Sequence, residues 1–148
     1  MDKVKYVYST ERKDTIRYRY PTHINDLVMN RSEAECTEVF LVVLNPGDAV
    51  NIHVHHDTEQ IFYMIAGTGT LRIGEDASEK YPLKPGDLIR IPPHTYHSVL
   101  CDGPETVTYI SIDCFTDGKP KGEPTWDSHV QNECKENGWD FNQIRQLK

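Results

Sequence analysis

A histidine-rich segment between two apolar runs is the feature that most constrains the fold of this chain. Residues 47–67 read Gly-Asp-Ala-Val-Asn-Ile-His-Val-His-His-Asp-Thr-Glu-Gln-Ile-Phe-Tyr-Met-Ile-Ala-Gly. His53 and His55 are two positions apart, so both imidazoles project from the same face if the segment is an extended strand. Gln60 follows at the start of the next apolar run. A metal ion needs several lone-pair donors converging on one point, and these three side chains can supply them.

A second polar segment lies further along the chain and offers a fourth donor. Residues 92–97 read Pro-Pro-His-Thr-Tyr-His, directly after a short apolar run. The gap of three residues places His94 and His97 on different faces if the segment is extended. This spacing favours His97 alone as the metal ligand.

The first segment resembles the first sequence motif of the cupins, G-x5-H-x-H-x3–4-E-x6-G. Gly47, His53, His55 and Gly67 stand at its fixed positions, and Gln60 stands where the family usually has glutamate. The apolar run after Gln60 has two apolar faces, so periodicity does not decide between Gln60 and Glu59 as the inward residue. Motif spacing favours Gln60.

The second segment resembles the second cupin motif, G-x5-P-x-G-x2-H-x3-N. Gly86, Pro92 and His97 match it, whereas His94 replaces the usual glycine and Cys101 the usual asparagine. The two motifs and their neighbouring strands cover residues 38–114. The resemblance implies an all-β fold, the cupin double-stranded β-helix or jelly-roll barrel.

The resemblance also implies one divalent transition metal ion inside the barrel, held by His53, His55, Gln60 and His97. Imidazole donors suit zinc, nickel, iron, manganese, cobalt or copper, so the identity of the metal stays open. A neutral amide in place of a carboxylate leaves the charge of the ion uncompensated. This substitution favours Lewis-acid chemistry and disfavours the high oxidation states of oxygen activation.

Cupins with glutamine at this position resemble, as a group, non-oxidative enzymes acting on small acids and sugars. We therefore expect an isomerase- or lyase-type enzyme acting on a small anionic or sugar-like substrate. A mononuclear metal dioxygenase and a non-catalytic binder of sugar-like molecules are the alternatives. Tyr96 and Glu59 are candidate catalytic proton carriers, with Tyr63 and His94 as further possibilities, and Arg90 could meet a substrate carboxylate.

Alternation and turn residues divide the single domain into three parts. Residues 1–37 form N-terminal strands and an arm, residues 38–115 form the barrel core, and residues 116–148 form a C-terminal extension with short helices. In the first part we expect strands over residues 4–8 and 16–20, followed by a loop over residues 21–26.

The C-terminal extension carries a helix signal. Thr125 or Asp127 can cap a helix that runs through Glu136, and Asn137-Gly138 is its stop signal. Its apolar stripe predicts packing on the outside of the barrel or against a partner subunit.

Composition narrows the class of partner. Acidic residues number 23 against 16 basic residues, giving a net charge of −7, which disfavours nucleic acid and anionic membranes as partners. No apolar run approaches the ~20 residues that span a bilayer, and the first residues lack a signal-peptide core. The four cysteines form no CxxC pair, which is typical of reduced thiols in a cytoplasmic protein, with a disulfide or a zinc knuckle as the alternatives. Edge strands and flanking arms of such barrels favour a homodimer.

Overall fold

A computed structural model describes residues 3–148, which form an all-β domain with short C-terminal helices, as the sequence predicts. The strands are β1 (Ile16–Arg19), β2 (Ile24–Met29), β3 (Thr37–Leu44), β4 (Thr58–Ala66), β5 (Gly69–Ile73), β6 (Glu79–Leu83), β7 (Leu88–Ile91), β8 (His97–Leu100), β9 (Val107–Phe115) and β10 (Arg145–Leu147). The helices are the short η1 (Arg31–Glu33), α1 (Trp126–Asn137) and α2 (Phe141–Ile144).

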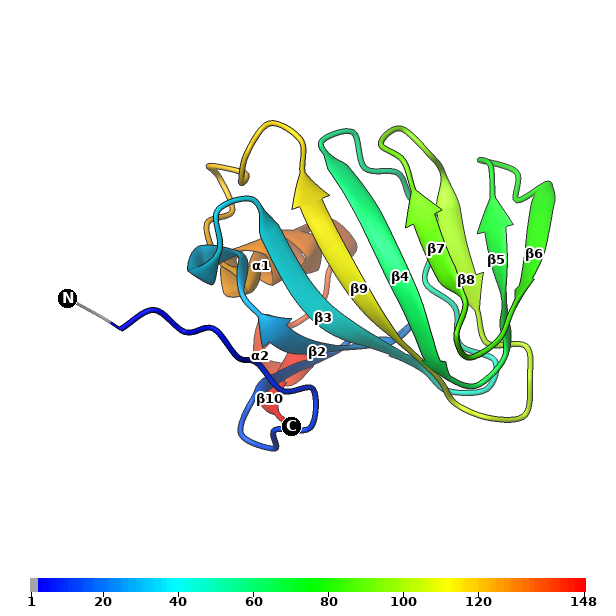
Figure 1. Ribbon diagram of the computed structural model, residues 1–148, viewed down its shortest axis with the longest axis horizontal. Coiled ribbons are helices and arrows are strands. Elements are labelled where there is room, and N and C mark those ends of the chain that lie inside the picture. The colour runs from blue at the N-terminus through cyan, green and yellow to red at the C-terminus, as the bar shows by residue number, and fades with distance from the viewer. Residues whose placement is uncertain (1–2) are drawn as a thin grey trace.

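The strands form two antiparallel sheets (Figure 1). The larger sheet has the order β10-β1-β2-β3-β9-β4-β7, and the smaller has the order β6-β5-β8. Strand β9 lies between β3 and β4, and it pairs with each of them over almost its whole length. The expected double-stranded β-helix architecture is therefore confirmed.

Alternation in β4 and β9 gives the large sheet an inner face. Gln60, Phe62 and Met64 are buried, whereas the residues between them face outward. In β9 the buried positions include Ser111 and Asp113. Gln60 pairs directly with Asp113 across the two strands, so their side chains lie on the same inner face. This register places polar groups inside an otherwise apolar core.

The segment that carries the histidine pair is extended, but it is not the regular strand that we expected. Ala49 pairs with Leu100 and His53 pairs with His97 as isolated bridges. The segment advances four positions where β8 advances three, so one extra residue interrupts the ladder. The backbone still stays close enough to β8 for the histidines to face the cavity.

Two expectations for the N-terminal part are wrong. Residues 4–8 form no strand, and Val4, Tyr6 and Val7 remain 65%, 84% and 82% exposed, because nothing pairs with this segment among the described residues. Residues 21–26, expected as a loop, instead contain the start of β2. Pairing with β3 and a partly buried ion pair between Asp26 and Arg17 overcome the low strand propensity of the polar residues there.

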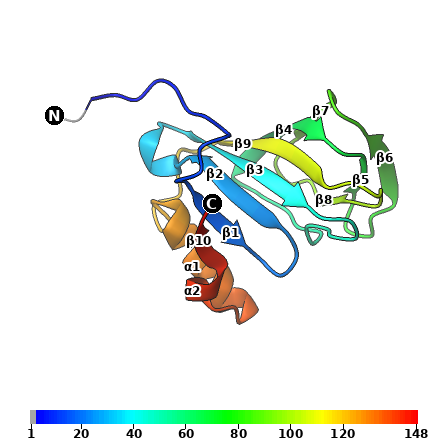
Figure 2. The same cartoon turned by 90° about the horizontal axis from the view of Figure 1, so that it is seen from below.

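Helix α1 confirms the helix signals. Thr125 is the N-cap and accepts the backbone N–H of Ser128. Gly138 ends the helix in the left-handed conformation, with φ of +72°. Trp126 packs on Tyr18 and Phe40, with ring centroids 5.5 and 4.7 Å away. In Figure 2 the two α helices lie against the part of the large sheet built by β1 and β2.

Helix α1 is the longest helix of the described region, and neither it nor any other helix there has the length and apolar character needed to cross a bilayer. All four cysteines are free thiols.

Candidate metal centre

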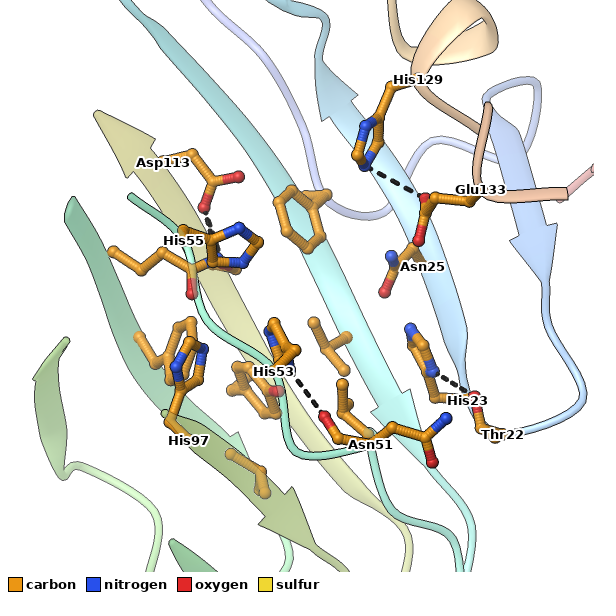
Figure 3. Close-up of a pocket in the computed structure, with 18 of the residues that line it drawn as sticks. Thr22, His23, Asn25, Asn51, His53, His55, His97, Asp113, His129 and Glu133 are labelled. Carbon is orange, nitrogen blue, oxygen red and sulfur yellow. Dashed lines mark hydrogen bonds and ion pairs between the residues drawn. The ribbon is translucent and has the colours of Figure 1, made fainter. Parts of the chain in front are cut away.

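Three histidine side chains meet at one end of a cavity inside the barrel (Figure 3). The candidate ligand nitrogens of His53, His55 and His97 all lie within 4.8 Å of one another. The backbone N–H groups of His53 and His97 each donate to the carbonyl of the other, over 3.1 and 3.0 Å. This reciprocal pairing places the two rings side by side, with centroids 4.2 Å apart.

Backbone carbonyls fix the orientation of two of these rings. The Nδ1 of His53 lies 2.6 Å from the carbonyl of Asn51, and the Nδ1 of His97 lies 2.8 Å from the carbonyl of Thr95. A carbonyl only accepts, so each Nδ1 carries the proton and donates. The Nε2 lone pair of each ring is then available to an ion, which is the usual arrangement of a metal-binding histidine.

Burial keeps the three imidazoles uncharged. Burial, together with the neighbouring His53 ring, lowers the pKa of His97 to about 3 and that of His55 to about 4. Burial also lowers the pKa of His53. A metal ion binds the neutral imidazole, so the triad is in its ligand form across the neutral range.

At the triad end of this cavity, two buried polar atoms have no hydrogen-bond partner among the described residues. They are the Nε2 of His97 and the Oε1 of Gln60, on residues that are 1% and 5% exposed. The Nε2 of Gln60 donates to the Oδ1 of Asp113 over 2.8 Å, which leaves the amide oxygen as the free acceptor. Buried acceptors without partners are rare in native proteins. Three imidazole nitrogens and one amide oxygen fit a divalent transition metal ion.

Asp113 is a buried carboxyl group beside this donor set. Burial and the neighbouring carboxyl of Glu38 raise its pKa well above the usual range. Glu38 itself is held by a buried ion pair with Arg31, with 2.6 Å between Oε1 and Nε. The side chain of Asp113 lines the cavity, so it can hold a proton there.

The cavity has a volume of about 320 Å³ and two polar ends. The histidine triad and Gln60 form one end, and Phe40, Val42, Phe62 and Tyr109 line the wall beside them. In Figure 3, His23, Asn25, His129 and Glu133 lie across the cavity from the triad. No lysine or arginine of residues 3–148 lines the cavity.

His129 and Glu133 of α1 form part of the second end, and they belong to an ion-pair cluster with Glu123, which precedes the helix. His129 lies between two carboxylates, with its Nδ1 3.1 Å from Glu123 and its Nε2 3.1 Å from Glu133. Although burial opposes the charge, these two hydrogen bonds raise the pKa of His129 to about 10. The positive charge of His129 is therefore already compensated by carboxylates.

The C-terminal extension contributes to the cavity, which the sequence did not predict. We expected it to pack outside the barrel or on a partner subunit, but α1 supplies a wall of the cavity. Its apolar stripe, with Val130 and Cys134, is buried in the hydrophobic core of the domain. The neighbouring positions of the helix, His129 and Glu133, face the cavity.

The remaining candidates from the sequence lie elsewhere. Glu59 forms an ion pair with Arg90 over 3.0 Å on the outer side of β4. Neither Glu59 nor Tyr96 is among the residues that line the cavity, so the geometry gives no support to the catalytic roles expected for them. His94 is exposed, with its Nδ1 2.7 Å from the Nδ1 of His56, and stands apart from the triad as its spacing indicated.

The cavity is also lined by polar residues that were not predicted as site residues, among them His23, Asn25, Asp113, His129 and Glu133. His23 reads as an ordinary surface histidine in the sequence, and Asn25 as a turn residue. The spacing of His129 and Glu133 places both on one face of a helix, which is the one local signal that could have pointed to them.

Comparison with known proteins agrees with this architecture. An uncharacterized protein of Methanocaldococcus jannaschii is 36% identical over 53 residues, which are 36% of this chain and 40% of that protein. The chain therefore spans less than half the length of this relative.

Two solved structures share the fold at low identity. An uncharacterized conserved protein with a double-stranded β-helix domain from Klebsiella pneumoniae is 20% identical, with a TM-score of 0.63 over 76% of this chain and 92% of that one. KdgF from Halomonas sp. is 23% identical, with a TM-score of 0.55 over 64% and 82%. At these identities both likenesses show the fold alone.

The Cupin domain family matches residues 40–113, which is half of the chain. The matched region contains the histidine triad and Gln60 as well as the strands that position them. The chain belongs to the Cupin domain family.

Proposed function

We propose that this protein binds one divalent transition metal ion through His53, His55, His97 and Gln60. We further propose that it is a non-oxidative isomerase- or lyase-type enzyme acting on a small anionic or sugar-like molecule. The observation that supports the metal most directly is the convergence of three neutral imidazoles in the cavity, one of them with a buried nitrogen that has no partner among residues 3–148.

A divalent ion bound there would polarise a carbonyl or carboxylate oxygen of the substrate. The ligand set is neutral throughout, so it does not cancel the charge of the ion. That feature favours attraction of an anionic or carbonyl oxygen over support of a high oxidation state.

The surrounding residues would orient the substrate and handle its protons. Asp113 holds Gln60 in place through the hydrogen bond to its Nε2. Because the carboxyl of Asp113 also lines the cavity, it is the group we propose to hold a proton next to the bound substrate. The apolar side chains of Phe40 and Phe62 line the cavity and would limit the access of water to a bound substrate.

Elemental analysis of protein purified without a metal-carrying affinity tag tests the metal centre. We expect close to one metal ion per parent chain and a loss of at least about tenfold in metal affinity in His53→Ala. His94→Ala is the matched control, because His94 lies in the same region but outside the triad, and it should retain the metal. Full retention of metal by a folded His53→Ala protein would overturn the ligand assignment.

Turnover is tested with the metal-loaded protein under anaerobic conditions. Incubation with a panel of aldoses, ketoses and sugar acids, followed by NMR, should reveal isomerisation or elimination without an oxidant. Substrate-dependent oxygen uptake in air, with no anaerobic reaction, would replace this proposal with a dioxygenase.

A further inference from the structure

The end of the cavity opposite the triad has its own unsatisfied polar groups. The Oδ1 of Asn25 and the Nε1 of Trp126 are both buried without a hydrogen-bond partner among the described residues, and the two residues are 7% and 2% exposed. Both residues line the cavity. One is an acceptor and the other a donor, so together they can bind a group that both donates and accepts.

Two further side chains face the same space. The Oε1 of Glu133 accepts from the hydroxyl of Tyr20 over 3.0 Å and lies 3.1 Å from the Nε2 of His129, and its other carboxylate oxygen has no partner among the described residues. His23 contacts Thr22 through Nδ1, over 2.8 Å, which leaves its Nε2 for a ligand. Figure 3 shows Asn25 between Glu133 and His23, with its side chain directed at the cavity.

The charge of this cluster excludes one class of ligand. No lysine or arginine of residues 3–148 lines the cavity, and the one cation, His129, is held between Glu123 and Glu133. A carboxylate or phosphate placed here would meet Glu133 without a free positive charge. Hydroxyl groups suit the cluster, because they can donate to Glu133 and Asn25 and accept from Trp126.

We propose that Asn25, Glu133, Trp126 and His23 form a hydroxyl-binding subsite, which holds the distal end of a polyhydroxylated substrate whose carbonyl or carboxylate end lies at the metal centre. This inference rests on the proposed function for the orientation of the substrate. It narrows the substrate class to sugar-like molecules with one charged end at most.

Calorimetric binding of three probes to the metal-loaded protein tests the subsite. Gluconate carries a carboxylate and a hydroxylated chain, whereas 2-hydroxyhexanoate keeps the carboxylate and the adjacent hydroxyl but lacks the distal ones. Glucarate adds a second carboxylate at the distal end. We expect gluconate to bind roughly tenfold tighter than 2-hydroxyhexanoate, as one or two hydrogen bonds to buried groups would give, and also tighter than glucarate.

Variants then assign the preference to residues. Glu133→Gln should reduce the penalty for glucarate, and Asn25→Ala should bring gluconate closer to 2-hydroxyhexanoate. Glu136→Gln removes an exposed carboxylate of the same helix and should leave all three affinities unchanged. Metal content is measured for every variant and should not differ from the parent.

Equal binding of gluconate and 2-hydroxyhexanoate by the parent, or no binding of gluconate, would overturn the subsite even if no variant folds. Loss of the metal centre itself is a separate outcome: a parent that takes up no metal overturns the proposed function. In that case the affinities of the metal-free protein for gluconate and 2-hydroxyhexanoate test the subsite. Tighter binding of gluconate supports it, and equal binding overturns it.

Discussion

At the scale of single residues, hydrogen bonds to the backbone preorganise two rings of the histidine triad for metal binding. The carbonyls of Asn51 and Thr95 hold the rings of His53 and His97, and burial keeps these imidazoles neutral. Protons compete little with a metal ion at such a site, because the imidazole nitrogens that would bind the ion are already unprotonated.

This preparation predicts a small release of protons on metal binding. At pH 6, three ordinary histidines with a pKa near 6.5 carry on the order of two protons in total, and a metal ion that binds all three would release these protons. Here the pKa of His55 is lowered to about 4 and that of His97 to about 3, so we expect release of roughly one proton or fewer. Titration calorimetry at pH 6 in buffers of different ionisation enthalpy measures the number directly. A release of two or more protons would show that the imidazoles are charged in the metal-free protein.

Gln60→Glu tests the amide ligand. The new carboxyl group would lie beside buried Asp113, which already neighbours the carboxyl of Glu38, and should destabilise the metal-free protein by roughly 1–3 kcal/mol. Added zinc should remove this deficit, because the new charge compensates the ion and strengthens its binding. Denaturant unfolding with chelator and with zinc measures both effects.

Glu59→Gln is the matched control, since Glu59 precedes Gln60 but pairs with Arg90 on the outside. Its effect should stay below about 1 kcal/mol with or without zinc. If Gln60→Glu lowered stability equally in both conditions, the side chain of residue 60 would not face the ion.

How far the sequence predicts the site depends on whether the signal is local. His53 and His55 follow from alternation, but choosing Gln60 over Glu59 needed the cupin motif, because both faces of the apolar run are apolar. The structure buries Gln60 and leaves Glu59 in an ion pair with Arg90. His23 could not be assigned to the site from the sequence. Its neighbours in the cavity come from a helix roughly a hundred residues later in the chain, and no local pattern links His23 to that helix.

At the scale of elements, helix α1 matters to the cavity as well as to the core. It brings Glu133 to the subsite while Val130 and Cys134 anchor it in the core. The ends of this helix were predictable, because Thr125 as N-cap and Gly138 as stop are local signals. The start of β2 was not, since its pairing with β3 comes from tertiary contacts rather than from propensity.

Gly138→Ala tests how the end of α1 is held. Gly138 has a φ of +72° and open space around its Cα, so an added methyl group would strain the backbone without a clash. We expect a loss of about 1 kcal/mol in the free energy of unfolding. Gly122→Ala also meets no neighbour within 4 Å, and its φ lies outside the left-handed region, so its effect should stay within about 0.5 kcal/mol. Equal effects of the two substitutions in denaturant unfolding would contradict the explanation.

At the scale of the whole molecule, the cavity joins distant parts of the chain. Strands β2, β3, β4, β8 and β9 build its walls, and α1 closes the end remote from the triad. Polar groups connect the two ends: Gln60 contacts Asp113, Glu38 pairs with Arg31, and the backbone carbonyl of Glu123 accepts from Arg31. The expected homodimer stays a prediction, which native mass spectrometry can check.

The charged cluster on α1 predicts how stability depends on pH. The folded-state pKa of His129 is about 10, above the value near 6.5 expected in the unfolded chain. A raised pKa means that the stabilisation is fully present below pH 6.5 and is lost as the pH rises through 10. The difference in unfolding free energy between the parent and His129→Gln should therefore be largest near pH 6, at roughly 2–4 kcal/mol, and shrink toward pH 10.

His129→Lys is the matched variant, because it keeps a positive charge between Glu123 and Glu133. Its stability should decline less than that of His129→Gln at pH 6, since the carboxylates keep a cationic partner, although the longer side chain loses the two-sided hydrogen bonding of the ring. Denaturant titrations at pH 6, 8 and 10 give all three curves. A parent-to-Gln difference that stayed constant across this range would mean that His129 is neutral in the folded protein. The Glu133 carboxylate, which lines the distal end of the cavity, would then lack its cationic partner, whereas Glu123 would keep Arg31 at 3.7 Å. That end of the cavity would exclude anionic groups more strongly.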